Sequence, residues 1–226
     1  MQMPMRPRFI IFAQGRTGST LLTRTLNTHP EICCHDEILS TPKLMPVNFL
    51  ERSAQRSNTQ AFGFHVKIYQ LRYSQGIDNA NKWLTDMCQR GWKIIYLWRK
   101  NLLRQAISNI FTEVSDLNKS QPKRITLPVE RLKLMINLRQ HNLIDERVAL
   151  TGLNHMELIY ERDLEDAQQQ ADTFELIQDY IGVSRIHLKP QLKKMVQGSL
   201  SDLLINYDEV VDWISSRPEY SHFLDT

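Results

Sequence analysis

One short segment of the sequence combines residue types that suit the binding of an anion: Gly15, Arg16, Thr17, Gly18, Ser19 and Thr20. Glycine allows a tight turn and a close approach of the backbone to a ligand. Hydroxyl side chains donate hydrogen bonds, and arginine carries a permanent positive charge with several donors. A helix that begins here would add backbone N–H groups and the positive end of its dipole. The segment therefore predicts a phosphate-binding turn.

The spacing of the glycines differs from two common nucleotide-binding motifs. An NTPase P-loop reads G-x-x-x-x-G-K-[ST], whereas Gly18 is followed by Ser19 and the lysine is missing. A dinucleotide-binding G-x-G-x-x-G is also absent. The alternative interpretation of the segment is a tight turn with a hydroxyl-rich helix cap that binds no ligand.

A second basic segment, IIYLWRKNLLRQAIS, follows another apolar run. It predicts a strand, then the basic pair Arg99 and Lys100, then a helix that carries Ser108. Two cations and a hydroxyl at a strand end suit a second phosphate group. Taken alone, the segment is better explained as the solvated start of a basic helix.

The elements that position these residues are predicted from apolar periodicity. Apolar or alternating runs predict strands over Arg8–Gln14, Ala61–Tyr69, Trp92–Trp98 and His155–Tyr160. Helical spacing predicts helices over Ser19–Asn27, Asn79–Gly91, Asn101–Val114, Val129–Leu150, Ala171–Gly182 and Ser201–Ser216. This alternation favours an α/β fold with a parallel sheet covered by helices on both faces.

Two details of these elements are further expectations. His65 lies on an otherwise apolar strand, so we expect a hydrogen-bonded, partly buried side chain and not a catalyst. The long helix should turn apolar residues inward, and Ser201 or Asp202 should begin the last helix. The inward candidates are Leu132, Met135, Leu138 and Val148.

Length and composition indicate one ordinary globular domain over residues 1–226, with residues 1–7 as a flexible N-terminus. The chain has 226 residues, of which 42% are hydrophobic and 23% charged. Its formal net charge of +3 is too small to argue for nucleic acid, but it suits a small anionic ligand. Three cysteines without a C-x-x-C pair predict neither a disulfide framework nor a zinc site.

The sequence gives no sign of membrane insertion or export. No run is long and apolar enough to predict a transmembrane segment. The first residues lack the apolar segment and the cleavage site of a signal peptide, so we expect a cytoplasmic location.

Five segments, taken in order, resemble motifs of sulfotransferases that use 3′-phosphoadenosine 5′-phosphosulfate (PAPS). They are QGRTGSTLL, IIYLWRKNLLRQAIS, YERDL, IQDYIGV and LKKMVQGSLSDLLINYDEV. Within the family they most resemble the bacterial branch of trehalose-sulfotransferase-like and nodulation-sulfotransferase-like enzymes. The resemblance implies a three-layer, P-loop-like α/β sulfotransferase fold with a mainly parallel sheet.

The resemblance also implies two phosphate sites for PAPS. The turn from Gly15 to Thr20, with Arg16 as its cation, would hold the 5′-phosphosulfate. The 3′-phosphate would lie against Ser108 and the basic pair, where we favour Arg99 and keep Lys100 as the alternative register. Two lysines of the C-terminal segment would close over the nucleotide: Lys193 and Lys194.

A lysine and a general base complete the implied site. Lys67 matches the lysine of a family strand, but Tyr69 takes the place of the base histidine of cytosolic members. In the trehalose-type branch a glutamate in the region after the first helix is the proposed base, and Glu37 matches it best. His35 and Asp36 are the neighbours to exclude, and a solvated polar loop is the alternative for this cluster.

The resulting hypothesis is transfer of a sulfuryl group from PAPS to a hydroxyl of a carbohydrate, lipid or small molecule, without a metal. A diverged P-loop kinase or NTPase is one alternative, and a non-catalytic nucleotide-binding protein is another. The expected partners are the hydroxyl-bearing acceptor and no nucleic acid. The oligomeric state stays open, with a homodimer as one option.

Overall fold

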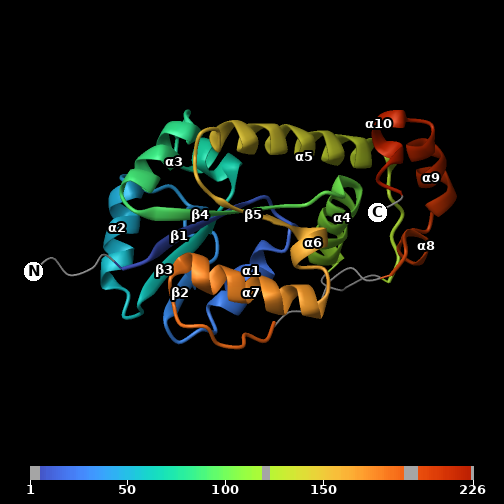
Figure 1. The fold of residues 1–226 in the computed structure, drawn as a ribbon. Helices are drawn as coiled ribbons and strands as arrows, with labels where there is room; N and C mark the ends of the chain where they lie inside the picture. The colour runs from blue at the N-terminus through green and yellow to red at the C-terminus, as the bar shows by residue number, and fades with distance from the viewer. Residues whose placement is uncertain (1–5, 119–122, 191–197, 225–226) are drawn as a thin grey trace, which may run out of the picture. The chain divides into compact units, whose positions relative to one another are not determined.

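The computed structural model describes residues 6–118, 123–190 and 198–224 (Figure 1). The chain divides into two compact units, Met1–Trp98 with Asn142–Leu192 and Arg99–His141 with Lys193–Thr226. The expectation of a single domain over 1–226 stays a prediction. Within the described residues, no helix is both long enough and apolar enough to cross a membrane.

The first unit contains a sheet of five strands in the order β2-β3-β1-β4-β5, and every pair is parallel. The strands are β1 (Arg8–Ala13), β2 (Ile32–His35), β3 (Ala61–Val66), β4 (Trp92–Trp98) and β5 (Met156–Ile159). The central strand β1 is buried from Phe9 to Ala13, which agrees with its continuous apolar sequence. The predicted parallel sheet is confirmed.

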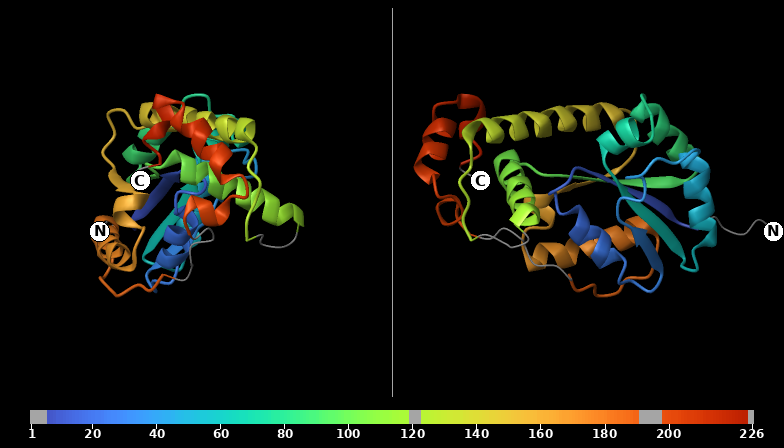
Figure 2. Two further views of the ribbon diagram at one scale, coloured as in Figure 1. Left: turned by 90° about the vertical axis from the view of Figure 1, so that its right-hand side faces the viewer. Right: turned by 180° about the vertical axis from the view of Figure 1, so that it is seen from behind.

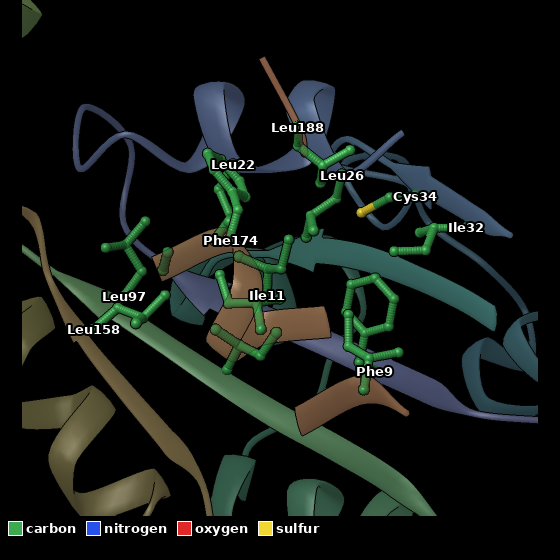
Figure 3. Close-up of a cluster of buried hydrophobic side chains, with 14 of the residues drawn as sticks. Phe9, Ile11, Leu22, Leu26, Ile32, Cys34, Leu97, Leu158, Phe174 and Leu188 are labelled. Atoms are coloured by element: carbon green, nitrogen blue, oxygen red, sulfur yellow. The ribbon is translucent and has the colours of Figure 1, made fainter. Parts of the chain in front are cut away.

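Helices cover both faces of this sheet, with α1 and α7 on one side and α3 on the other (Figures 1 and 2). The covering helices are α1 (Ser19–Leu26), α2 (Pro46–Arg56), α3 (Ala80–Gln89) and α7 (Ala167–Ile181). Side chains of β1 alternate between the faces: Ile11 packs with Leu22 and Phe174, and Ile10 and Phe12 pack into the opposite core (Figure 3). The predicted three-layer α/β class is confirmed.

Two predicted strands end earlier than their apolar sequence suggested, and one strand was missed. The strand β3 stops at Val66, and a short π-helix, η1 (Gln70–Ser74), follows it. Tyr160 begins the short helix α6 (Tyr160–Asp163) and does not end a strand. The missed strand is β2, Ile32–His35.

The second unit packs helices around its own apolar core. Its elements are α4 (Leu102–Asn118), the first part of α5 (Val129–Ala149), α8 (Leu200–Leu203), α9 (Tyr207–Ser215) and α10 (Pro218–Ser221). A bridge between Ile125 and Leu204 ties the connection before α5 to the C-terminal segment. Asn206 extends this tie, because its side chain bonds both the N–H and the carbonyl of Leu127 at 2.8 and 3.0 Å.

This tie corrects the prediction of one helix over Ser201–Ser216. The backbone is extended at Leu204, where it joins the bridge, so the segment forms α8 and α9 separately. The cap of α8 is also different, because Ser199 accepts from the backbone of Asp202 in a capping box. Ser201 and Asp202 are therefore inside the helix and do not begin it.

The buried stripe of α5 is more polar than its sequence pattern predicted. Leu132 and Met135 are buried as expected, but Leu138 and Val148 are 46% and 63% exposed. The inward positions between them are occupied by polar side chains at helical spacing: Arg139, Asn142 and Glu146. The prediction of inward positions is therefore confirmed for Leu132 and Met135 and wrong for Leu138 and Val148.

The strand β3 passes close to β1 at Gly63, which pairs with Phe9. A Cβ atom built on Gly63 would lie 2.2 Å from the Phe9 ring, far inside any normal contact. Phe9 is wholly buried in the core between the sheet, α1 and α7 (Figure 3). The glycine therefore leaves room for the aromatic ring.

We expect Gly63→Ala to lower the free energy of unfolding by about 1–3 kcal/mol, the usual cost of an overpacked core. Urea denaturation measures this loss. In Gly63→Ala combined with Phe9→Leu, the smaller side chain should make room for the new methyl group. The double variant should then lose less than the sum of the single variants, and strict additivity would contradict the contact.

Candidate functional site

The predicted phosphate-binding turn joins β1 to α1 at the carboxyl end of the central strand. Its backbone is left-handed at two places, Arg16 with a φ of 66° and Gly18 with a φ of 92°. The buried Thr17 hydroxyl donates to the carbonyl of Gln14 at 2.7 Å and closes the turn. The proton of that hydroxyl, which we expected to contact an anion, is therefore used inside the turn.

The turn leads directly into the N-terminus of α1. Among the described residues, no side chain caps this helix, whose N-cap is Gly18. Ser19 is buried and Thr20 is half-buried in the first turn. Helix amides without a capping acceptor, together with the helix dipole, give this end a partial positive charge. The geometry is thus suited to an anion.

Two acidic residues, Asp36 and Glu37, follow β2 directly. Glu37 has a left-handed backbone with a φ of 46°. Within the described residues, Arg16 and Glu37 are the non-glycine residues with a positive φ. Such conformations cost about 1–3 kcal/mol and cluster at functional sites. Both strained residues fall on positions that the sequence predicted to act in catalysis.

The carboxylate of Glu37 is held by two side chains from the end of β3 and the start of η1. Its Oε1 lies 2.6 Å from the Lys67 ammonium, and its Oε2 accepts from the Gln70 amide at 2.7 Å. Gln70 also accepts from the backbone N–H of Lys67 at 3.0 Å. These bonds form a closed cluster of three residues. Gln70 was missed because its sequence context gives no signal of this role.

The same lysine reaches the phosphate-type turn. A Cβ atom on Gly15 would lie 3.7 Å from both Cε and Nζ of Lys67, an ordinary van der Waals contact. Burial disfavours the charge of this ammonium, but hydrogen bonds to Glu37 and Tyr69 outweigh it and raise the pKa of Lys67. Lys67 is therefore a cation at neutral pH. The structure brings the predicted turn, lysine and base together.

A second pair lies beside this cluster. His65 is wholly buried and bonds Asp36 at 2.8 Å, which confirms the expected hydrogen-bonded histidine. Ligand atoms of Asp36, Glu37 and His65 lie within 4.8 Å of one another, a spacing that could suit a metal. The Lys67 ammonium already neutralises Glu37, and both nitrogens of His65 are engaged by protein groups. We therefore assign no metal ligand here.

A buried carboxylate supports the other side of the turn. Glu146 is wholly buried, with its Oε2 3.3 Å from the Tyr96 hydroxyl and 3.4 Å from the amide of Gln14. Burial and the nearby carboxylate raise the pKa of Tyr96 far above its usual range, so the phenol stays neutral. This support was missed, since a glutamate in an amphipathic helix is expected at the surface.

The residues predicted for the 3′-phosphate lie in the second unit. Arg99 is half-buried and Lys100 is exposed, ahead of α4. Ser108 is 8% exposed on α4. The lysines predicted to close over the nucleotide, Lys193 and Lys194, lie outside the described residues. The choice between Arg99 and Lys100 stays a prediction.

The fold is shared with sulfotransferases. The crystal structure of a sulfotransferase from Alicyclobacillus acidocaldarius matches with a TM-score of 0.58 and 16% identity, over 98% of this chain and 95% of that one. The structure of mouse sulfotransferase SULT7A1 complexed with PAP matches with a TM-score of 0.50 and 13% identity, over 98% and 89%. No protein-family model and no curated protein sequence match the chain. These structural matches show the fold. The predicted relation to the trehalose-sulfotransferase-like and nodulation-sulfotransferase-like branch stays a prediction.

Gly18 is required by its backbone and by its neighbour. A Cβ atom there would lie 3.0 Å from a carbon of the Tyr160 ring. Gly76 is a matched control, since its φ is 65° and a Cβ atom would meet nothing within 4 Å. Replacing either glycine by alanine should cost about 1–2 kcal/mol for the left-handed backbone.

We expect Gly18→Ala to destabilise the protein more than Gly76→Ala, because only Gly18 adds a clash with Tyr160. Urea denaturation of both variants gives the comparison. Equal losses of unfolding free energy would show that the Tyr160 ring does not restrict the turn.

Proposed function

We propose that the chain transfers a sulfuryl group from PAPS to a hydroxyl of an acceptor. The observation that carries this proposal is the meeting of three features at one place. Lys67 lies beside Gly15 of an anion-type turn and forms an ion pair with Glu37. The fold shared with sulfotransferases, one of them complexed with PAP, supports the choice of nucleotide.

The reaction requires little covalent chemistry from the protein. The acceptor oxygen would form a bond to sulfur as the bond between sulfur and the phosphate oxygen breaks. The products are a sulfate ester and adenosine 3′,5′-bisphosphate (PAP), and the acceptor proton passes to a base. By analogy with phosphoryl transfer, catalysis is mostly positioning and electrostatic stabilisation of developing charge. The turn amides and Arg16 would provide that stabilisation.

Lys67 and Glu37 would have different roles in the reaction. The ammonium of Lys67 lies between the turn and the carboxylate, so it would neutralise charge on the sulfuryl oxygens. The carboxylate of Glu37 would accept the acceptor proton as general base. Its side chain is 32% exposed, which leaves it accessible to an acceptor. Gln70 would hold it in place.

The 3′-phosphate remains assigned to Arg99 and Ser108, with Lys193 or Lys194 closing over the nucleotide. Arginine suits a phosphate better than lysine because its planar donors can bind two oxygens at once. The half-buried position of Arg99 supports this choice over the exposed Lys100. We further propose a hydroxyl-bearing acceptor, a cytoplasmic location, no metal and no nucleic-acid partner.

PAP should stabilise the protein against heat more than ATP or AMP, because it alone carries both the 3′- and the 5′-phosphate of the expected nucleotide. At 100 times the dissociation constant a ligand adds about 2.7 kcal/mol. For a chain of this size that raises the melting temperature by about 5–10 °C. Differential scanning fluorimetry measures it. Stronger stabilisation by ATP with magnesium would favour the kinase or NTPase alternative.

Glu37→Gln should lower turnover by about 10²–10⁴-fold, the usual contribution of a general base. The acceptor is first found by incubating the protein with labelled PAPS and a cell extract, and turnover is then measured with it. PAP should bind the variant at least as tightly, because the change removes a negative charge beside the turn.

Glu175→Gln is the matched control, because Glu175 on α7 is about half exposed and pairs with Arg185 at the surface. It should keep full turnover. Near-normal turnover of Glu37→Gln would move the base to another residue. A wild-type protein that binds PAP but labels nothing would favour the non-catalytic alternative.

A further inference from the structure

Both ring nitrogens of His65 face hydrogen-bond acceptors. Nδ1 lies 2.8 Å from Oδ1 of Asp36, and Nε2 lies 3.1 Å from the carbonyl oxygen of Ala13. The side chain of His65 is wholly buried, so water cannot replace either partner. The protonation state of the ring therefore follows from these two partners.

A backbone carbonyl only accepts hydrogen bonds, so Nε2 must carry a proton. An ionised carboxylate also only accepts, so Nδ1 must carry the second proton. The hydrogen bond from His65 lowers the pKa of Asp36, and the positive charges of Lys67 and Arg24 act in the same direction. Asp36 is thus the ionised member of the pair, and the ring of His65 is an imidazolium.

The two partners of this ring stand at the bases of the two candidate turns. Ala13 is the last residue of β1, two residues before Gly15. Asp36 is the residue directly before Glu37. His65 lies on β3 between the two strands that lead into these turns. It is a physical link between the anion-type turn and the carboxylate proposed as base.

We infer that His65, as a buried imidazolium, is a positioning residue that fixes Glu37 relative to the phosphate-type turn. The protonation state rests on the two hydrogen bonds of the buried ring and on an ionised Asp36, while the consequence for catalysis rests on the proposed function. The charged groups around the pair are Glu37 in the acidic turn, Lys67 after β3 and Arg24 on α1. Glu37 forms its ion pair with Lys67. The charged partner of His65 is therefore Asp36.

The protonation state is tested by nitrogen NMR of the ¹⁵N-labelled full chain. An unperturbed imidazole is mostly neutral at about pH 7.5. We expect both ring nitrogens of His65 to be protonated at this pH. In Asp36→Asn the amide can donate to Nδ1, so the ring should become neutral with one protonated nitrogen.

A single protonated nitrogen in the wild-type ring would overturn the inference. Unchanged double protonation in Asp36→Asn would overturn it as well, because the carboxylate would not be the cause. Neither measurement needs PAPS or an acceptor, so failure here is distinguishable from failure of the proposed function.

The positioning role is tested by two variants of His65, each of which keeps one of its two hydrogen bonds and removes the other. Asparagine places its amide nitrogen near the position of Nδ1, and glutamine places it near Nε2. His65→Asn can therefore still bond Asp36, and His65→Gln can still bond the carbonyl of Ala13. If either variant fails to fold, Asp36→Ala tests the link, because it removes the bond to Nδ1 and leaves the bond between His65 and the carbonyl of Ala13; it should lower kcat and keep PAP affinity near that of the wild type.

His65→Gln should lower kcat by roughly 10- to 100-fold, because a displacement of about 1 Å at a catalytic group costs up to 100-fold. Its affinity for PAP should stay near that of the wild type. His65→Asn should keep more of kcat and bind PAP more weakly, since the turn loses its support. Equal losses in both variants, in step with their stability, would reduce His65 to a structural residue.

Discussion

Balance of charge at the carboxyl ends of β2 and β3 determines the geometry of the candidate site. Two consecutive acids each face one basic side chain: Asp36 faces His65, and Glu37 faces Lys67. Charges withdrawn from water are costly unless they are paired and hydrogen-bonded. Successive side chains of an extended chain point to opposite sides, whereas residues two apart share a face. Glu37 has a left-handed backbone, and the two consecutive acids pair with His65 and Lys67, which are two residues apart.

The anion-type turn has contacts of its own that hold its backbone. Thr17 closes it through the carbonyl of Gln14, and Gly18 packs against the ring of Tyr160. The ring of His65 bonds the carbonyl of Ala13, the last residue of the strand β1 that leads into the turn. Reactions that depend on positioning benefit when such supports are in place before the substrate binds. The turn and the acidic cluster therefore behave as one preorganised unit, linked through β3.

The sequence predicted the parts of this unit whose signal is local. Continuous apolar runs gave β1 and β4, and the glycines and hydroxyls gave the turn between β1 and α1. The pairing of Glu37 with Lys67 was beyond prediction, because it joins residues 30 positions apart through tertiary contact. Glu146 is buried although a glutamate is normally expected at the surface. The helical segment is interrupted at Leu204 by a bridge to Ile125, which is distant in the sequence. Local patterns carry no information about such partners.

The shared fold and the strained backbone at Arg16 and Glu37 are two different kinds of support for the proposed function. A structural likeness at 16% or 13% identity shows the fold, but function depends on the residues that the fold positions. At Arg16 and Glu37 the backbone adopts a conformation that glycine would take without strain. The chain instead carries a charged side chain at both positions, against a cost of about 1–3 kcal/mol each. A charged side chain kept at that cost supports a functional role for Arg16 and Glu37, in agreement with the proposed sulfuryl transfer.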